Sequence, residues 1–483
     1  MDSKSEHTFQ KRLTLFDATA IVMGSMIGSG IFIVSADIAR IVGAPGWLLV
    51  VWIATGVLTV TAALCYGELA CLFPYAGGQY VFLREAYHPL IAFLYGWASF
   101  LVIQCGTIAA VAMGFAKFLG VLFPWISESR FGFRWGMFHF STVHLVAIAS
   151  ILFLTWFNTR GIVGGKRLQN VFTSSKFVIL AGFILVGLLA ARNPDAVRLN
   201  AGVFWDALKT TGTGRIPLSG FALVAALGTA MVGSLFSADA WNNITFASDE
   251  VVRPRRDIPL SLFFGTLSVC VLYALVNVVY LYVLPLRGDP NGATAFQKGI
   301  QFATDDRVAT AAMHGLLGEK AAVVMAVLIV ASTFGCNNGI ILASARLYYA
   351  MAKDGLFFKD VGTLNRKGVP AKGLYVQGVW TSLLCLSGKY GDLLDYVVFT
   401  VLLFYILTMV SIFQLRKKRP DLPRPYKAIG YPVVPILYVV LVLFIMISLL
   451  ILKPLYTWPG LIVVILGIPV FFFWRRIHRE KSA

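Results

Sequence analysis

The chain has 483 residues, of which 58% are hydrophobic and only 13% are charged, and its formal net charge is +18 at pH 7. This composition excludes an ordinary soluble globular protein and is typical of a polytopic membrane protein, so the lipid bilayer is the first expected partner. A positive excess can indicate nucleic acid. In a membrane chain, however, Lys and Arg in the loops set the topology, and we expect no nucleic-acid binding.

No motif in the sequence points to a metal, a cofactor or catalysis. The six cysteines fall in or beside apolar segments, without CxxC or Cys/His spacing. They are Cys65, Cys71, Cys105, Cys270, Cys336 and Cys385. No Ser/His/Asp, Cys/His or paired-carboxylate grouping has usable spacing, and no GxxxxGK[ST] phosphate loop occurs. We therefore expect no metal, no cofactor, no disulfide and no enzymatic activity.

Apolar segments divide the chain into candidate membrane spans. A helix needs about 20 residues to cross a bilayer. Twelve segments can be read, near 14–42, 46–72, 90–120, 141–158, 169–191, 219–247, 258–284, 318–350, 372–388, 392–414, 431–452 and 456–474. The predicted fold class is an all-α integral membrane protein with twelve transmembrane helices.

The distribution of Lys and Arg predicts the topology. These residues are more frequent in one set of alternate loops, and the positive-inside rule places that set and both termini in the cytoplasm. The polar N-terminus has no apolar core followed by a cleavage site, so it is not a signal peptide. The predicted organisation begins with a tail (1–12) and a core of ten spans (13–414, with spans one to five at 13–191 and six to ten at 219–414). A basic cytoplasmic loop (415–430), spans eleven and twelve (431–474) and a tail (475–483) follow. The expected location is the plasma membrane.

The first span is predicted to break in mid-membrane, over Met26, Ile27, Gly28, Ser29 and Gly30. Glycine costs a helix about 1 kcal/mol relative to alanine, and several glycines fall close together here. Backbone groups freed at membrane depth are tolerated only where protein or a water-filled cavity satisfies them. A second half-helix starting near Gly30 would direct its partly positive N-terminus at a carboxylate. Close packing of two helices through small residues is the alternative.

The sixth span becomes small and polar in mid-membrane, over Phe236, Ser237, Asp239, Trp241 and Asn242. Interrupted spans at corresponding places in two halves indicate a transporter site. The first and sixth spans each open one half, which predicts a five-plus-five inverted repeat with two extra spans. Carbonyls near Phe236 would accept hydrogen bonds from an ammonium, while Gly28–Gly30 would hold a carboxylate. A zwitterion held at both ends is an α-amino acid.

Two ionisable residues lie inside predicted spans, where each is costly and indicates function. Lys176 either snorkels to the interface or is a fixed cation bonded to the first span and to a hydroxyl of the eighth, Ser332 or Thr333. A fixed ammonium there would replace a bound sodium ion, and a titrating one would couple transport to protons. Asp239 could receive the substrate ammonium or a cationic side chain, pair with a polar neighbour, or carry a proton. 

The third span offers two more candidates for lining the pocket, Gly106 and Thr107.

These motifs resemble a known family. Gly28-Ser29-Gly30-Ile31-Phe32 is similar to the first-span signature of the amino acid–polyamine–organocation superfamily, especially its L-type amino acid transporter branch. Phe236 followed by Trp241-Asn242 resembles the sixth-span motif of that branch, and Gln169–Thr173 leading into Lys176 resembles its fifth span. Ser344-Ala345-Arg346-Leu347 and the basic pattern Leu415–Pro425 complete the resemblance.

The resemblance implies a substrate held by the first and sixth spans, sodium-independent uptake or exchange, Lys176 standing where related transporters bind sodium, and Phe236 as a gate over the substrate. The family's glycine pair in the sixth span is Asp239-Ala240 here, which leaves room for a cationic side chain. Animal members bond to a single-span glycoprotein through a cysteine after the third span. The corresponding loop, Val121–Phe140, has none, so we expect no disulfide-linked heavy subunit. That absence and the short tails favour a prokaryotic inner-membrane protein.

We therefore expect a sodium-independent secondary transporter of L-α-amino acids that exchanges neutral amino acids by alternating access. Proton-coupled transport, and transport of cationic amino acids or polyamines, are the alternatives. Polyamines have no carboxylate for the Gly28–Gly30 half-helix. A transporter-like nutrient sensor and a channel are the rivals from other classes. The sequence leaves the oligomeric state open.

Overall fold

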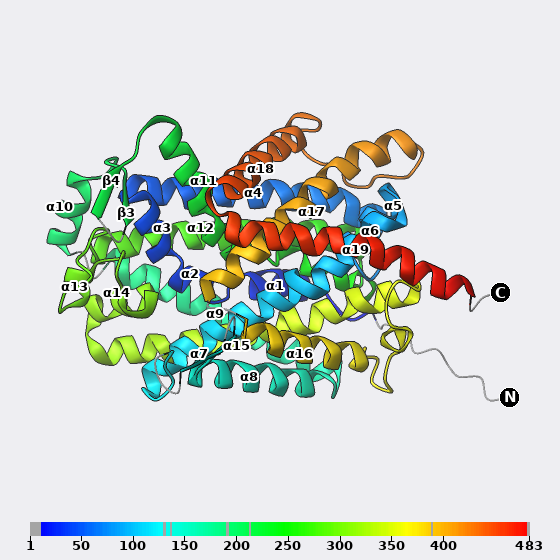
Figure 1. The fold of residues 1–483 in the computed structure, drawn as a ribbon, viewed down its shortest axis with the longest axis horizontal. Helices are drawn as coiled ribbons and strands as arrows, with labels where there is room; N and C mark the ends of the chain where they lie inside the picture. The colour runs from blue at the N-terminus through cyan, green and yellow to red at the C-terminus, as the bar shows by residue number, and fades with distance from the viewer. Residues whose placement is uncertain are drawn as a thin grey trace.

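The computed structural model describes residues 11–128, 132–135, 138–189, 193–211, 214–387 and 390–480. Within these ranges the chain is almost wholly helical, and many of its helices run along the long axis of the molecule (Figure 1). Ten of the described helical segments are long and apolar enough to cross a membrane. Large apolar side chains such as Leu437, Ile447 and Phe472 face outward, where lipid would cover them. The protein is a multi-span membrane protein.

The helices of the first half alternate between long spans and short pieces. They are α1 (Leu15–Met26), α2 (Gly30–Ile33), α3 (Ser35–Val42), α4 (Pro45–Leu72), α5 (Gln79–Ala86), α6 (Pro89–Ala98), the π-helix η1 (Ser99–Ile103), α7 (Gln104–Leu122), α8 (Thr142–Asn158), α9 (Ile162–Leu189) and α10 (Pro194–Gly202). Two antiparallel hairpins connect spans, one of β1 (Phe133–Trp135) with β2 (Phe138–Phe140) and one of β3 (Leu208–Thr211) with β4 (Gly214–Pro217).

The rest of the chain also combines long helices with short pieces. Its helices are α11 (Gly220–Ser237), the 3-10 helix η2 (Trp241–Glu250), α12 (Pro254–Val283), α13 (Ala295–Lys298), η3 (Thr304–Asp306), α14 (Val308–Leu317), α15 (Glu319–Lys353), η4 (Lys359–Gly362), α16 (Ala371–Cys385), α17 (Tyr390–Lys418), α18 (Val433–Leu452) and α19 (Pro454–Glu480). α12 packs along α4, and α1 packs against α12, α9 and α15. All four residues of α2 are buried, so the first predicted break lies inside the bundle.

Some predicted boundaries differ from the helices. α8 and α16 form where the fourth and ninth spans are predicted, but they have 17 and 15 residues. At 1.5 Å per residue they reach about 25 and 22 Å, less than the roughly 30 Å of a hydrocarbon core. α9 begins at Ile162, earlier than the predicted fifth span, and α17 continues to Lys418, into the segment predicted as a loop from residue 415.

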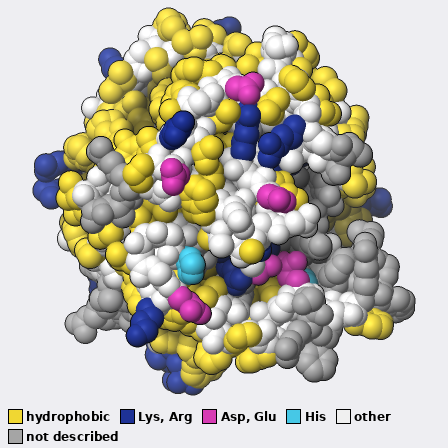
Figure 2. All heavy atoms as spheres, turned by 90° about the vertical axis from the view of Figure 1, so that its left-hand side faces the viewer, with side chains coloured by type: hydrophobic (Ala, Val, Ile, Leu, Met, Phe, Trp, Pro, Cys, Tyr) yellow, Lys and Arg dark blue, Asp and Glu magenta, His cyan; other side chains and the backbone are white. Residues whose placement is uncertain are grey.

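The two ends of the bundle are built differently (Figure 1). One end carries α10, α13 and the β3–β4 hairpin, and we call it the β3–β4 end. The opposite end carries α5 and the C-terminal part of α19. Figure 2 looks onto the β3–β4 end, where Lys, Arg, Asp and Glu side chains lie across the middle and hydrophobic side chains are dense around the flanks. This pattern is expected of a face that meets water while its sides meet lipid.

Candidate functional site

The first helix interruption lies between α1 and α2. α1 ends at Met26, and Ile27 leaves the helical region with φ −75° and ψ 83°. The Gly28 N–H turns back to the Met26 carbonyl at 2.8 Å, and α2 begins at Gly30 with Ser29 as its N-cap. The first N–H groups of any helix have no carbonyl partner within it. This turn therefore places helix-end donors deep inside the bundle.

The second interruption lies between α11 and η2. α11 ends at Ser237, and the chain passes through residues 238–240 before η2 begins. Ala240 has φ +64°, a left-handed conformation that is uncommon for a residue with a side chain. Beyond it, the Thr245 hydroxyl donates to the Asn242 carbonyl at 2.7 Å, and such local bonds compete with an α-helical backbone. The polar sequence thus ends one helix and starts a tighter one.

The two interruptions are in direct contact. A Cβ atom added at Gly30 would lie 2.1 Å from the Ser237 Oγ and 3.0 Å from the Ser237 Cα. One added at Gly233 would lie 2.9 Å from the Cβ of Val34. Glycine at both positions therefore permits the start of α2 to lie against the end of α11. The N-terminus of α2 is therefore in contact with the C-terminus of α11.

Side chains of neighbouring helices bind the carbonyls that precede the first interruption. The Lys176 ammonium on α9 donates to the Gly24 carbonyl at 2.8 Å, and Lys176 is 1% exposed. The Cys336 thiol on α15 donates to the Ser25 carbonyl at 3.1 Å. A buried ammonium and a thiol thus hold the last turn of α1.

The two hydroxyls proposed to join Lys176 behave differently. Ser332 donates to the Ile27 carbonyl at 3.4 Å, within the interruption itself. Thr333 donates to its own helix, to the Ile329 carbonyl at 2.9 Å. Neither hydroxyl has a hydrogen bond to Lys176 in the part of the chain that the structure describes. Ser332 and Lys176 instead bind the same segment through different carbonyls.

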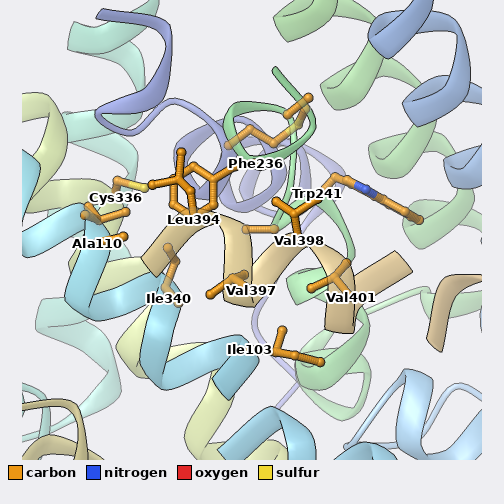
Figure 3. Packing of buried hydrophobic residues seen from close by; sticks show 14 of the residues in the cluster. Ile103, Ala110, Phe236, Trp241, Cys336, Ile340, Leu394, Val397, Val398 and Val401 are labelled. Carbon is orange, nitrogen blue, oxygen red and sulfur yellow. The ribbon is translucent and has the colours of Figure 1, made fainter. Parts of the chain in front are cut away.

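The Phe236 ring points into an apolar cluster. It lies beside Leu394 and Cys336, among side chains from α7, α15 and α17 (Figure 3). Gly106 lies where α7 approaches α17, since a Cβ atom there would be 2.7 Å from the Val397 side chain.

The hydroxyl of Thr107 donates within its own helix, to the Ile103 carbonyl at 2.7 Å.

Trp241 and Asn242 contact other helices than α1. The Trp241 ring lies 4.7 Å from the Tyr66 ring and 5.6 Å from the Tyr405 ring. The Asn242 amide donates to the Gln79 side chain at 3.1 Å. The two residues therefore join η2 to α4, α5 and α17.

Asp239 pairs with a side chain of α17. The Tyr405 hydroxyl donates to its Oδ1 at 2.5 Å. A cavity of about 20 Å³ adjoins the pair, with Thr59 and Tyr438 among its lining residues. That volume holds about one water molecule. Among the described residues no group of three or more His, Cys, Asp or Glu side chains is placed to hold a metal.

Ion pairs fasten the interrupted segments at both ends of the bundle. At the β3–β4 end, the Arg40 guanidinium of α3 donates to the Asp306 carboxylate at 2.7 Å and to the Gln301 carbonyl at 2.8 Å. At the opposite end, Arg346 of α15 pairs with Glu250 of η2, and both side chains are 4% exposed. The segment after each interruption, α2–α3 in one case and η2 in the other, is thus fixed to a neighbouring element by an ion pair.

A smaller network lies at the opposite end, outside the spans. The Tyr80 hydroxyl of α5 donates to the Asp354 carboxylate at 2.7 Å, and the Arg84 guanidinium donates to the same oxygen at 2.6 Å. Burial, and next the negative charge of Asp354, raise the pKa of the Tyr80 phenol above its ordinary value. The phenol therefore stays a proton donor at physiological pH, and α5 is held to the end of α15.

Comparison with known families decides what this architecture is. The model of the family described as amino acid permease matches residues 13–472. The chain belongs to the amino acid permease family. It is a transporter of amino acids rather than an enzyme.

Individual relatives align over nearly the whole permease. It is 28% identical over 481 residues to the large neutral amino acids transporter small subunit 2 of Homo sapiens, covering 98% of this chain and 82% of that protein. It is 28% identical over 476 residues to the b(0,+)-type amino acid transporter 1 of Homo sapiens, covering 96% and 88%. It is also 28% identical over 482 residues to the Asc-type amino acid transporter 1 of Mus musculus, covering 97% and 83%.

Sequence reasoning missed two side chains that touch the permease interruptions. Tyr273 of α12 donates to the Met26 carbonyl at 2.8 Å and to the Ser237 carbonyl at 3.2 Å. The second is Cys336, whose sulfur lies against Gly28. A tyrosine inside an apolar span is a usable signal, since a buried phenol needs a hydrogen-bond partner. A lone cysteine in such a span gives no comparable signal.

Proposed function

We propose that this permease is a sodium-independent secondary transporter of L-α-amino acids that exchanges neutral amino acids by alternating access. The observation that carries the proposal is the contact between the two interruptions, where Gly30 lies against Ser237. A helix N-terminus favours a carboxylate and a helix C-terminus favours a cation. The start of α2 and the end of α11 supply one of each, side by side. A zwitterion with both charges on one carbon fits such a pair of helix ends.

The clamp we propose has two sides. On the carboxylate side, the N–H groups of Ser29 and Gly30 would bind the carboxylate. Met26, Ile27 and Gly28 form the turn that presents these groups, since the Gly28 N–H bonds the Met26 carbonyl. Carbonyls around Phe236 and Ser237 form the ammonium side. The Phe236 carbonyl accepts the N–H groups of Asp239 and Ala238. The Ser237 carbonyl accepts the Tyr273 hydroxyl at 3.2 Å, and its second lone pair can accept a substrate ammonium.

The neighbours of the clamp have supporting roles in this proposal. The Phe236 ring gates the substrate from the apolar cluster that it faces. Trp241 and Asn242 act indirectly, by holding η2 on the helices behind it. Gly106 and Thr107 shape the α7 wall.

Lys176 supports sodium independence. Its ammonium already occupies the position beside the α1 carbonyls, where it donates to Gly24. A sodium ion bound by the same carbonyl oxygens would be repelled by that charge. Ser332 completes this part of the site through Ile27. We therefore propose that the lysine permanently supplies the positive charge beside the α1 carbonyls that a bound coupling ion would supply only while it is bound.

We further propose a topology of twelve spans, with α8 and α16 counted, arranged as a five-plus-five inverted repeat plus α18 and α19. The support is the position of the two interruptions, in the first span of each half. The positive-inside rule supports a plasma-membrane protein with both termini in the cytoplasm. The absence of cysteine from Val121–Phe140 supports a prokaryotic permease that works without a disulfide-linked heavy subunit.

A direct test compares leucine with its two one-charge analogues. Thermal unfolding of the purified permease would be measured with L-leucine, with isopentylamine, which lacks the carboxylate, and with 4-methylpentanoate, which lacks the ammonium. A ligand that binds only the native state raises the unfolding temperature. We expect stabilisation by leucine alone. Equal stabilisation by isopentylamine would contradict the carboxylate side of the clamp.

Asp239 favours a second candidate, transport of cationic amino acids. Its carboxylate is buried inside a span, and it belongs to none of the ion pairs in the described part of the chain. Such a group would accept a substrate guanidinium or ammonium. Its adjoining cavity holds only about one water, so a long cationic side chain would require α11 and α17 to separate. L-lysine uptake that is lost in Asp239→Ala, with leucine uptake retained, would establish this candidate over the neutral exchanger.

A further inference from the structure

One hydroxyl group in the permease contacts both interrupted helices. The phenol of Tyr273 lies 2.8 Å from the Met26 carbonyl and 3.2 Å from the Ser237 carbonyl. Met26 is the last residue of α1, and Ser237 is the last residue of α11. Carbonyls at a helix C-terminus have no partner within the helix. The same side chain therefore satisfies the corresponding helix end in each half of the chain.

The Tyr273 side chain is held firmly in this position. It is 1% exposed, and its ring meets the Trp52 ring edge-on, with centroids 5.5 Å apart. One turn along α12, Asn277 donates to the Tyr273 carbonyl at 2.8 Å and accepts from the Ser35 hydroxyl of α3 at 2.7 Å. α12 is thus fixed to both sides of the first interruption, and its phenol reaches across to the second.

We propose that Tyr273 is a positioning residue that sets the distance between the carboxylate and ammonium sides of the clamp, and that it thereby selects α-amino acids over β-amino acids. The proposal rests on the function proposed above. A β-amino acid has one more methylene between its two charges. It can bind both sides only if α2 and the end of α11 move apart. The Tyr273 hydroxyl bonds the Met26 carbonyl, where the first interruption begins, and the Ser237 carbonyl, where α11 ends. It therefore opposes that movement.

The same helix provides a matched comparison. Tyr280 is fully buried and donates its hydroxyl to the Ile31 carbonyl of α2 at 3.2 Å. Like Tyr273 it is a phenol of α12 bonded to the backbone of the first segment. Unlike Tyr273 it has no hydrogen bond to α11 in the described structure. Removing the Tyr280 hydroxyl therefore loosens α2 but leaves intact the hydrogen bonds through which Tyr273 joins α1 to α11.

The experiment measures selectivity rather than rate alone. Wild type, Tyr273→Phe and Tyr280→Phe would be reconstituted in proteoliposomes, and the inhibition constants of L-leucine and its isomer β-leucine against labelled leucine uptake would be measured. Loss of one hydrogen bond corresponds to about a three- to tenfold change in binding. We expect the ratio of the β-leucine constant to the L-leucine constant to fall by that factor in Tyr273→Phe and to keep its wild-type value in Tyr280→Phe.

An unchanged ratio in Tyr273→Phe, or an equal fall in both variants, would overturn the positioning role, because general loosening acts on both. Wild type that binds neither isomer would refute the proposed function itself. If Tyr273→Phe is not recovered folded, Trp52→Leu displaces the same phenol by removing its edge contact, and it is expected to lower the same ratio.

Discussion

The Lys176 ammonium of α9 donates a 2.8 Å hydrogen bond to the Gly24 carbonyl of α1, two residues before that helix ends at Met26. Both groups lie inside the bundle, where an unpaired charge is costly. The bond therefore links the position of the fifth predicted span to the shape of the first. In the function proposed above, this fixed charge takes the place of a bound sodium ion.

Replacing Lys176 by methionine, which is unbranched, one heavy atom shorter and uncharged, tests this link. The Gly24 carbonyl would lose its partner, which costs about 1–3 kcal/mol, so we expect a lower unfolding temperature and a loss of most leucine uptake. Uptake would be measured in sodium-containing and sodium-free buffer. The wild-type rate is expected to be the same in both buffers, and a wild-type rate that depends on sodium would contradict the role of Lys176.

Gly30→Ala tests the contact between the interruptions. The new Cβ atom would lie 2.1 Å from the Ser237 Oγ, and overpacking of this kind costs about 1–3 kcal/mol. We expect strongly reduced uptake from protein that still inserts in the membrane. Gly182→Ala on α9 is the control, because among the described residues nothing beyond the adjoining backbone of α9 lies within 4 Å of its added Cβ. Equal rates in both variants would show that the close approach of α2 and α11 is not needed.

Glu68→Gln tests a second buried charge, one that serves stability. The Glu68 carboxylate of α4 is 1% exposed, and it accepts from the Arg416 guanidinium at 3.0 and 2.7 Å and from the Ala428 N–H at 2.7 Å. Removing one partner of a buried pair costs about 3–5 kcal/mol, and the partial exposure of Arg416 reduces this. We expect a clear fall in unfolding temperature, measured against Glu319→Gln, which changes an exposed carboxylate. Similar values in the two variants would refute the anchoring of the α17–α18 segment by Glu68.

We expect the ion pair between Arg40 and Asp306 to act as part of a gate at the β3–β4 end. Their ion pair ties α3 to the segment before α14, and alternating access requires such ties to open. Both side chains are partly exposed, so a coupling of only about 0.5–1 kcal/mol is expected. Uptake by Arg40→Gln, Asp306→Asn and the double variant would be compared. We expect the double variant to match the single ones, and strictly multiplicative effects would exclude a functional pairing.

Sequence reasoning located the interruptions because they have local causes. The closely spaced glycines disfavour a helix at Gly28 and Gly30. The small polar residues after Phe236 also disfavour a continuous helix, so both breaks can be predicted from the local sequence. The amino acid permease family and the apolar segments were likewise predictable. The inverted repeat and the roles of the site residues stay predictions.

Other features depend on contacts between distant segments. Trp241 and Asn242 belong to the predicted motif, but only the fold shows that they contact α4, α5 and α17. Tyr273 lies 247 residues from Met26 along the chain, and no local pattern relates the two. The burial of Glu68 depends on Arg416, 348 residues away. Such long-range pairs cannot be read from periodicity or composition.

Labelled uptake into proteoliposomes tests most directly whether this permease moves zwitterionic amino acids by exchange. Vesicles with purified protein would receive labelled L-leucine in sodium-free buffer, with and without unlabelled leucine inside. We predict rapid uptake that requires the internal amino acid and that isopentylamine does not inhibit. If protein shown to be folded takes up no amino acid across a full panel, the permease does not have the proposed exchange function.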